Sequence, residues 1–485
     1  MTAGGRLTRG ALSSVGVDLS LAAAAVVAAP VMVHGLGAHA YGVYALVTVL
    51  AGQLGFLQLG LAPAVTRRVA EERSGGDGGG ATERVAWLLA LASALLLALA
   101  FRLGGPAFFA RVGGLDPVTL FAAAAAVAAQ PVVGVSQAIL LGRERFTALA
   151  SVRLVQGIAR TAGGAGVVAA GGGVAAVLAV QAAIDLLSAL AGALAGREAH
   201  ARGGDTAAAA RALLGLGLPF AASGVLAALL VDGEKLAIGW ARSLDQLTYY
   251  AVPYGAVFRL AIVPAALVTV LAPRLSALAV TARADEAVGL VRRTTRVTAA
   301  VLVAAAAPLA ACAPEWLGLW LGADFAQRAS TTARLLLVAV VVNGIASPAC
   351  AIVRAGGRPA ALVIAYAAEL PLHLAVVYAL VRGWGITGAA AAWLVRAAVD
   401  AAVQRMLGAR AIGRPLGDGA ALSASAAVLL AFALGCTLLG PAWWGVRLAA
   451  GLALSALALA RGLDRADWLL LRQAAVRPAR GAVAA

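Results

Sequence analysis

Charged side chains within long apolar runs are the residues of this sequence best placed to do chemistry, because an ionisable group in hydrocarbon is costly and usually faces a partner or a pathway. Arg160 and Asp185 lie in two consecutive apolar runs, each 11 residues from the glycine-rich connection between them. A helix rises about 1.5 Å per residue, so both side chains reach the same depth. We therefore interpret them as a structural ion pair.

A second set of charges occupies two later apolar runs. Glu369 and Arg396 each lie 10 residues from the start of their run, which again places them at similar depth. His373 and Asp400 follow one helical turn later on the same faces. We interpret Arg396 and Asp400 as members of structural ion pairs that lock one group of helices. A proton relay through Glu369 and His373 is the alternative.

Two further arginines, Arg259 and Arg153, lie within apolar runs and have no obvious acidic partner in the sequence. The guanidinium group stays charged, and its planar fork of donors matches the oxygens of a phosphate. These arginines are therefore predicted to line a cavity and to bind a pyrophosphate there. The alternative is that they pair with Asp18 or lie along a helix surface.

Asp232 and Lys235 lie near the end of another apolar run, and Lys235 is the only lysine in the sequence. A spacing of three residues lets the two charges neutralise each other on one helix face at the membrane interface. An outer gate or a contact to a sugar is the alternative interpretation of this pair.

Long apolar helices must hold these charges, and the composition provides them. Of the 485 residues, 62% are hydrophobic and 12% are charged, and the mean hydropathy is +0.92. Soluble domains contain about 45–50% apolar and about 25% charged residues, so a water-soluble globular protein is excluded. At about 20 apolar residues per crossing, hydropathy predicts an all-α polytopic membrane protein with fourteen spans. These spans are 12–34, 41–64, 85–103, 116–140, 146–170, 174–196, 213–239, 248–272, 297–321, 333–353, 359–381, 386–407, 418–439 and 443–461.

The sequence predicts no cofactor, metal site or disulfide framework. Its three cysteines are an odd number in separate apolar runs. The glycine-rich stretches at 75–80 and 171–173 do not continue into Gly-Lys-Ser/Thr, so they are interpreted as turns rather than phosphate loops. The net charge of +16 comes without a nucleic-acid-binding motif, and no nucleic acid partner is expected.

The basic residues instead predict the orientation in the membrane. If the N-terminus is cytoplasmic, 27 of the 38 Lys and Arg residues fall on the cytoplasmic side, 7 on the outer side and 4 within spans. Cytoplasmic connections of membrane proteins carry an excess of these residues. Both termini are therefore predicted to be cytoplasmic, which requires an even number of spans.

A weak internal repeat predicts how the spans are grouped. When the chain is shifted by 213 residues, the run QAILLGRERFTAL aligns with CAIVRAGGRPAAL. Two six-helix lobes related by an axis along the membrane normal, with a central cavity between them, form a transporter architecture. The predicted domains are an N-terminal lobe at 1–196, a cytoplasmic linker at 197–212, a C-terminal lobe at 213–410, and two extra helices with a basic cytoplasmic tail at 411–485.

Short motifs in a fixed order carry a family resemblance. They include G-A-H-A-Y-G-V-Y at 37–44, L-Q-L-G-L-A-P-A-V-T-R at 57–67, Y-Y-A-V-P-Y at 249–254 and W-L-G-A-D-F at 320–325. Over about residues 10–410 the sequence resembles polysaccharide flippases of the Wzx type. These proteins belong to the multidrug/oligosaccharidyl-lipid/polysaccharide exporter (MOP) superfamily.

The resemblance implies a protein that flips an undecaprenyl-pyrophosphate-linked oligosaccharide from the inner to the outer leaflet of a bacterial plasma membrane by alternating access. The implied partners are this lipid-linked glycan, the lipid bilayer and the polysaccharide polymerase or ligase machinery. By comparison with drug exporters of the same superfamily, Asp18 is a candidate for ion or proton coupling; a polar residue near the interface is the alternative.

Three other functions are weighed against this one. A cation-coupled multidrug antiporter and a lipid II flippase share the expected fold. The lipid II flippases carry several arginines in their first two helices, whereas the first two predicted spans here contain none. An intramembrane glycosyltransferase, polymerase or ligase would need a sizeable segment with clustered catalytic groups, which the longest connections at 65–84, 197–212 and 274–296 do not contain. An enzyme is therefore not expected, and the sequence does not define the oligomeric state.

Overall fold

The computed structural model describes residues 3–54, 60–75, 80–112, 114–196, 205–280, 283–355, 359–417 and 419–464, and these residues form helices and turns without any strand. Ten helical segments of this described part are long and apolar enough to cross a membrane. The prediction of an all-α polytopic membrane protein is confirmed.

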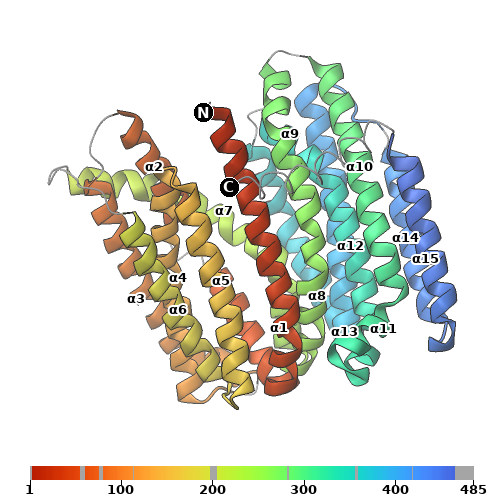
Figure 1. Cartoon of the computed structure of the whole chain (residues 1–485), viewed down its shortest axis with the longest axis horizontal. Helices are drawn as coiled ribbons and strands as arrows, with labels where there is room; N and C mark the ends of the chain where they lie inside the picture. The colour runs from red at the N-terminus through yellow and green to blue at the C-terminus, as the bar shows by residue number, and fades with distance from the viewer. Residues whose placement is uncertain are drawn as a thin grey trace, which may run out of the picture. The chain divides into compact units, whose positions relative to one another are not determined.

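The α-helices follow one another along the chain in the order shown by the colours of Figure 1. They are α1 (Ala3–Gln53), α2 (Leu61–Gly75), α3 (Gly80–Ala110), α4 (Pro117–Gly142), α5 (Phe146–Ala169), α6 (Val174–Ala195), α7 (Thr206–Ala241), α8 (Leu244–Val257), α9 (Ile262–Val280), α10 (Ala284–Ala311), α11 (Ala313–Leu321), α12 (Ala323–Ala355), α13 (Pro359–Ile412), α14 (Gly419–Leu438) and α15 (Trp444–Gly462). Two short 3-10 helices are η2 (Phe258–Ala261) and η3 (Pro441–Trp443).

Two of these helices are broken in the middle. α1 breaks at Gly37, where φ is 78°, and α13 breaks at Gly385, where φ is 59°. Glycine reaches positive φ without the steric cost of a Cβ atom. As a result, α1 holds the first predicted span and residues 41–53 of the second, and α13 holds the eleventh and twelfth.

Two predicted spans are interrupted in the structure. The predicted span 297–321 is divided at Cys312, where α10 ends and α11 begins. A proline in the first turn of α11 suits a helix start, because the first amide groups have no intrahelical partner. The predicted span 248–272 runs through α8, the 3-10 turn η2 and α9.

The chain divides into two compact units. Unit 1 consists of Met1–Val252 and Glu369–Gly385, and unit 2 consists of Pro253–Ala368 and Ile386–Ala485. The chain therefore passes from unit 1 to unit 2 at the break in α13. The predicted lobes, 1–196 and 213–410, are the parts expected to move during transport. The division into these lobes stays a prediction.

In unit 1, α4 packs against α2, α3 and α6 (Figure 1). A Cβ atom at Gly192 of α6 would overlap the hydroxyl of Ser136 on α4, and this hydroxyl donates to the Ala189 carbonyl at 3.0 Å. Small residues let membrane helices approach in this way. α7 belongs to the same unit because it packs against α1, α2 and α3.

In unit 2, α12 contacts α9, α10, α11 and α14. Most of its membrane-length segment is buried and apolar on all sides, as expected for a helix at the centre of a bundle. α14 and α15 both pack against α10. Arg447 of α15, which is almost fully buried, forms an ion pair with Glu315 of α11 and so attaches the last helix to the unit.

Candidate functional site

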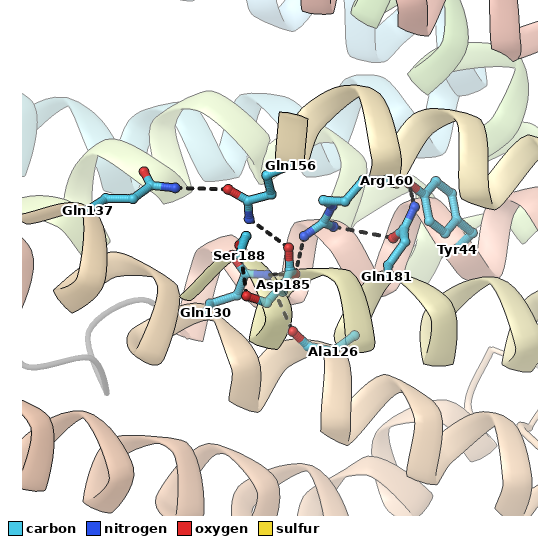
Figure 2. Close-up of polar contacts among 9 residues, drawn as sticks. All are labelled: Tyr44, Ala126, Gln130, Gln137, Gln156, Arg160, Gln181, Asp185 and Ser188. Carbon is cyan, nitrogen blue, oxygen red and sulfur yellow. Dashed lines mark hydrogen bonds and ion pairs between the residues drawn. The ribbon is translucent and has the colours of Figure 1, made fainter. Parts of the chain in front are cut away.

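The first candidate site is a polar network in unit 1, centred on the carboxylate of Asp185 in α6 (Figure 2). Gln130 of α4 donates to this carboxylate at 3.0 Å and Gln156 of α5 donates at 2.7 Å. Arg160 of α5 donates as well and forms an ion pair with it. Arg160 and Asp185, which the sequence analysis expects at one depth, are in direct contact.

The network extends in both directions from Asp185. Arg160 also donates to Gln181 at 3.3 Å, and Gln181 donates to the hydroxyl of Tyr44 on α1 at 3.1 Å. On the other side, Gln137 donates to Gln156 at 2.9 Å. Figure 2 shows the side chains as a continuous row from Gln137 to Tyr44, supplied by α1, α4, α5 and α6.

Helical spacing explains why these residues share one face. Gln130 and Gln137 lie seven residues apart on α4, and Gln156 and Arg160 lie four apart on α5. The sequence interpretation used the two charges alone and missed the amides, although their spacing of four and seven within apolar runs was a usable signal.

The network is reachable from outside its helices. The Asp185 side chain is 0% exposed, whereas the Arg160 side chain is 27% exposed. A guanidinium, four side-chain amides and a phenol offer both donors and acceptors. The arrangement can therefore exchange hydrogen bonds with a ligand rich in hydroxyl or phosphate oxygens.

Arg153 and Asp18, predicted for different roles, come together in unit 1. The Arg153 guanidinium lies 3.5 Å from the Asp18 carboxylate, and both side chains are nearly half exposed. Arg153 therefore has the acidic partner that the sequence interpretation named as the alternative to binding a pyrophosphate. An exposed pair of this kind contributes little stability and is easily opened by a competing anion.

His373 of α13 contacts a carboxylate that received no role from the sequence. Its Nε2 atom lies 3.2 Å from Glu234 of α7, with the two side chains 2% and 0% exposed. Neither oxygen of Glu234 makes a hydrogen bond to a described residue. The dyad therefore places a carboxyl group and an imidazole in direct contact within the buried part of unit 1.

The register between α7 and α13 accounts for the dyad. Arg242 at the end of α7 donates to the Val381 carbonyl at 2.9 Å. Glu234 and His373 each lie eight residues before this contact, a helical rise of about 12 Å on both helices. The two side chains therefore meet because the helices run parallel from a common fixed point.

Asp232 and Lys235 form the i,i+3 ion pair that their spacing allows on α7. Both side chains are mostly buried, with 22% and 12% exposure. Lys235 also has a further interaction in the structure. The geometry thus follows the first of the two interpretations made from the sequence.

Arg259 lies in the 3-10 turn η2, between α8 and α9 in unit 2, and is half-buried. It interacts with other groups in the structure, so the expectation of a guanidinium without a partner is wrong. Next to it, Phe258 stacks on Tyr254 at 5.3 Å between ring centres, and Tyr254 meets Trp393 edge-on at 5.5 Å. Arg259 therefore borders an aromatic cluster at a break in a membrane helix.

Arg396, Asp400 and Gln404 follow one another at helical spacing on the part of α13 that belongs to unit 2, and all three are buried. Gln404 donates to Asp400 at 2.8 Å and approaches the Tyr366 hydroxyl at 3.4 Å. Glu369, predicted at the same depth as Arg396, belongs to unit 1. Their predicted relation stays a prediction.

The described part of the chain contains no group of three or more His, Cys, Asp and Glu side chains that could hold a metal ion. The charged groups found here pair with one another or with amides. They are suited to binding and to holding a proton.

Comparison with known proteins gives a family and a named relative. The family described as "Polysaccharide biosynthesis protein" matches residues 31–330. A protein of Shigella flexneri named as an O-antigen transporter is 22% identical over 189 residues, which cover 38% of this chain. The match spans 44% of that relative, less than half of its length.

Solved structures match over most of the chain. The lipid II flippase MurJ in an inward closed conformation has a TM-score of 0.66 and 11% identity, with 93% of this chain and 98% of that chain covered. An inward-facing multidrug resistance transporter of the MATE family has a TM-score of 0.66 and 14% identity, with 84% and 99% covered. A MOP-superfamily transporter from Pyrococcus furiosus has a TM-score of 0.58 and 15% identity, with 84% and 95% covered.

At these identities the solved structures establish the fold, which is that of MOP-superfamily transporters. The family match agrees with the predicted resemblance to polysaccharide flippases, and the fold is the one expected from the predicted superfamily. The named proteins are transporters and flippases, in agreement with the sequence-based expectation of a transporter rather than an enzyme.

Proposed function

Since the chain belongs to the polysaccharide biosynthesis protein family, we propose that it flips an undecaprenyl-pyrophosphate-linked oligosaccharide across a bacterial plasma membrane by alternating access. The oligosaccharide would move from the cytoplasmic to the outer leaflet for surface polysaccharide assembly. The O-antigen transporter named above supports the substrate class, and the lipid II flippase shows that this fold carries a lipid-linked sugar.

The observation that carries the proposal is the row of polar side chains in Figure 2. A structural lock between helices would need only Arg160 and Asp185. The row adds four glutamines and Tyr44, inside helices whose other residues are mainly apolar. Polar groups in such helices are costly unless they are satisfied, so an extended partly exposed row favours a polar substrate such as a glycan.

The pyrophosphate is assigned to the arginines. Arg259 lies where a membrane helix is interrupted, and discontinuous helices commonly carry the binding sites of transporters. Arg153 is nearly half exposed beside Asp18, and an anion can compete for its guanidinium. The Asp232–Lys235 pair is a further candidate contact to the sugar.

Coupling to an ion or proton is assigned to the acidic groups of unit 1. The Glu234–His373 dyad is the strongest candidate because both side chains are buried and share one contact of 3.2 Å. Asp18 and Glu369 are the other candidates. Arg160 with Asp185 and Arg396 with Asp400 are assigned to holding the helices.

Reconstituted protein tests the proposal directly. Liposomes would contain an undecaprenyl-pyrophosphate-linked disaccharide with a fluorophore that an impermeant reductant bleaches. Without protein only the outer leaflet is bleached, and with the wild-type protein the inner population should be bleached as well. Gln156→Leu and Gln181→Leu should slow this second phase, whereas Gln327→Leu, at an exposed glutamine outside the network, should not. Wild-type protein that leaves the inner population protected would overturn the proposal.

A cation-coupled multidrug antiporter is the second candidate, because the MATE-family structure matches as well as the flippase does and unit 1 buries the carboxylates of Asp185 and Glu234. Expression in drug-sensitive cells separates the two functions. Raised resistance to cationic dyes, together with no flipping in liposomes, would favour the antiporter. Selective flipping of lipid II instead of the disaccharide lipid would assign the chain to the lipid II flippases.

A further inference from the structure

Unit 2 buries two arginines close to the point where α10 ends and α11 begins. Arg334 of α12 and Arg447 of α15 are 4% and 2% exposed. Arg447 forms its ion pair with Glu315 of α11, and Arg334 donates from Nε to the Ala310 carbonyl, in the last turn of α10, at 2.9 Å. Arg447 and Glu315 also act electrostatically on the Arg334 guanidinium. The three charged groups therefore form one cluster inside this unit, which we call the Arg334 cluster.

Close packing holds Arg447 in the cluster. One turn after it, a Cβ atom at Gly451 of α15 would lie 3.1 Å from the Ala307 carbonyl oxygen of α10. One further turn along, the Ser455 hydroxyl donates to the Ala304 carbonyl at 2.9 Å. The start of α15 thus lies directly against the end of α10, and the Arg447 guanidinium stays inside the unit.

The Arg334 cluster carries more positive than negative charge. Two guanidinium groups face one carboxylate, which leaves one positive charge among the described residues that form the cluster. The C-terminus of α10 attracts a cation, but the N-terminus of α11 begins at the next residues and has the opposite partial charge. A buried charge without a counter-charge is costly, so the cluster favours an additional anion.

The hydrogen-bonding groups of the cluster indicate the same kind of ligand. Arg334 Nη2 and Arg447 Nε are buried and make no hydrogen bond to a described residue, and the same holds for Glu315 Oε2. A water molecule would satisfy these atoms and leave the charge in place. An anion accepts hydrogen bonds from guanidinium groups and also removes the charge.

We propose that a small monovalent anion such as chloride binds between Arg334 and Arg447. One negative charge neutralises the cluster, and the nearly complete burial of both arginines suits an ion of atomic size rather than a phosphate or a lipid headgroup. Glu315 is 29% exposed and marks the side from which the ion enters. The bound ion joins α11, α12 and α15 at one end of unit 2, whatever molecule the protein transports.

Thermal unfolding of the purified full-length protein tests the site. The apparent Tm should be about 2–4 °C higher in sodium chloride than in sodium gluconate of equal ionic strength, because an ion that binds only the folded protein stabilises it. Arg334→Met, which places an apolar side chain in the cluster, should lose this difference. Arg328→Met, at an exposed arginine of the same helix that pairs with Asp324, should keep it. Equal Tm values of the wild type in the two salts would overturn the proposal, as would a chloride effect that survives in Arg334→Met.

Two further measurements do not require Arg334→Met to fold. The chlorine NMR signal of a chloride solution should broaden when wild-type protein is added, and bromide should reverse the broadening. Glu315→Gln keeps both arginines and removes the competing carboxylate, so its Tm increase should be half-maximal at roughly tenfold lower chloride concentration than that of the wild type. Broadening that bromide does not reverse, or a half-maximal concentration in Glu315→Gln that is equal or higher, would overturn the proposal.

Discussion

Asp185 receives more hydrogen bonds than neutralisation of its charge requires. Arg160 alone supplies the opposite charge, yet Gln130 and Gln156 also donate to the carboxylate. If Arg160 turns towards a ligand, the Asp185 carboxylate still accepts hydrogen bonds from Gln130 and Gln156. A residue of this kind can hold helices together and still release one partner for binding.

Arg160→Ala should lower the yield and the apparent Tm of the protein. Removing one member of a buried pair costs about 3–5 kcal/mol, and the lower end applies here because the guanidinium is 27% exposed. Arg160→Ala/Asp185→Ala should recover part of this loss, because no isolated charge remains. Fluorescence-detected size-exclusion chromatography before and after heating measures both variants. A double variant that is no more stable than Arg160→Ala would remove the pair from the structural role.

Arg259→Ala should slow transport of the lipid-linked oligosaccharide while the protein still folds and inserts. A hydrogen bond to a charged group contributes about 1.5–3 kcal/mol, or roughly ten- to a hundredfold in rate. Arg259→Lys should keep part of the activity, since its charge survives and its bidentate fork does not. The flipping assay compares the three proteins at equal amounts. Full activity of Arg259→Ala would exclude the residue from binding, and loss of folded protein in both variants would make it structural.

Glu234→Gln should uncouple transport from a proton gradient. Glutamine keeps the shape of the side chain and cannot release a proton next to His373, so the protein should fold and exchange lipid without a gradient. Transport should no longer accelerate when a pH difference is imposed across the liposome membrane. Glu286→Gln, at an exposed glutamate paired with Arg283, is the matched control and should behave as the wild type. Normal acceleration in Glu234→Gln would rule out the dyad.

Local spacing allowed only part of these contacts to be predicted. Arg160 and Asp185 flank one short connection, so equal depth fixed their encounter. Glu234 and His373 are separated by more than five helices, and their meeting depends on the parallel packing of α7 and α13, which the sequence does not display. Arg259 was expected to lack a partner, and it interacts with other groups in the structure.

The start of α4 shows how a helix is fixed at the edge of the membrane. Asp116 accepts a hydrogen bond from the Thr119 amide at 2.9 Å, and Pro117 opens the first turn. This bonding to Thr119 lowers the pKa of Asp116 below its ordinary value. The charged cap therefore stabilises the helix above the pKa of the unfolded carboxyl group, about 3.9, and this stabilisation is lost as pH falls through the lower folded value.

Asp116→Ala should lower stability at pH 7 by about 0.5–2 kcal/mol, the usual cost of losing a helix cap. The difference from the wild type should shrink as pH approaches 3, where the wild-type cap also becomes protonated. Apparent Tm values in detergent at the two pH values measure this change. Asp116→Asn keeps an acceptor and should remain close to the wild type at pH 7. A loss that is independent of pH would show that the charge of Asp116 plays no part.

The existence of the helices was predictable, but the breaks inside predicted spans were not. Runs of about 20 apolar residues require helices in a bilayer, because every backbone polar group must be satisfied internally. The breaks at Cys312 and η2 arise within apolar sequence, where hydropathy does not change. The break of α13 at Gly385, in contrast, lies between the predicted spans 359–381 and 386–407.

The orientation of the whole molecule is the next quantity to measure. In a background without the three cysteines, Thr206→Cys should react with a maleimide only from the cytoplasmic side. Ala323→Cys and Ala442→Cys should react from outside, because the distribution of Lys and Arg places their connections there. Impermeant reagent on intact cells and on opened cells separates the two groups. Labelling of residues 206 and 323 from the same side would contradict the fourteen-span topology.

Composition was sufficient to predict the membrane class and motif order was sufficient for the superfamily, and both are properties of the whole chain. The boundaries of the two compact units were not predictable, because a segment late in the chain belongs to unit 1. Residues Glu369–Gly385 belong with the N-terminal unit although 116 residues of unit 2, Pro253–Ala368, precede them in the chain. A sequence repeat locates related segments and does not locate such an exchange.

The shared helix α13 has a consequence for synthesis of the protein on the ribosome. The contact from Arg242 to Val381, like the dyad beside it, joins residues 139 positions apart in the chain. At about 5–20 residues per second, α7 emerges roughly 7–28 s before its partner exists. A lone acidic side chain in hydrocarbon is costly, so we expect Glu234 to be unfavourable in the bilayer until His373 arrives to contact it. Maturation of unit 1 therefore waits for translation of the first segment of unit 2, Pro253–Ala368, and a nascent chain truncated before residue 369 should be a substrate for membrane proteases.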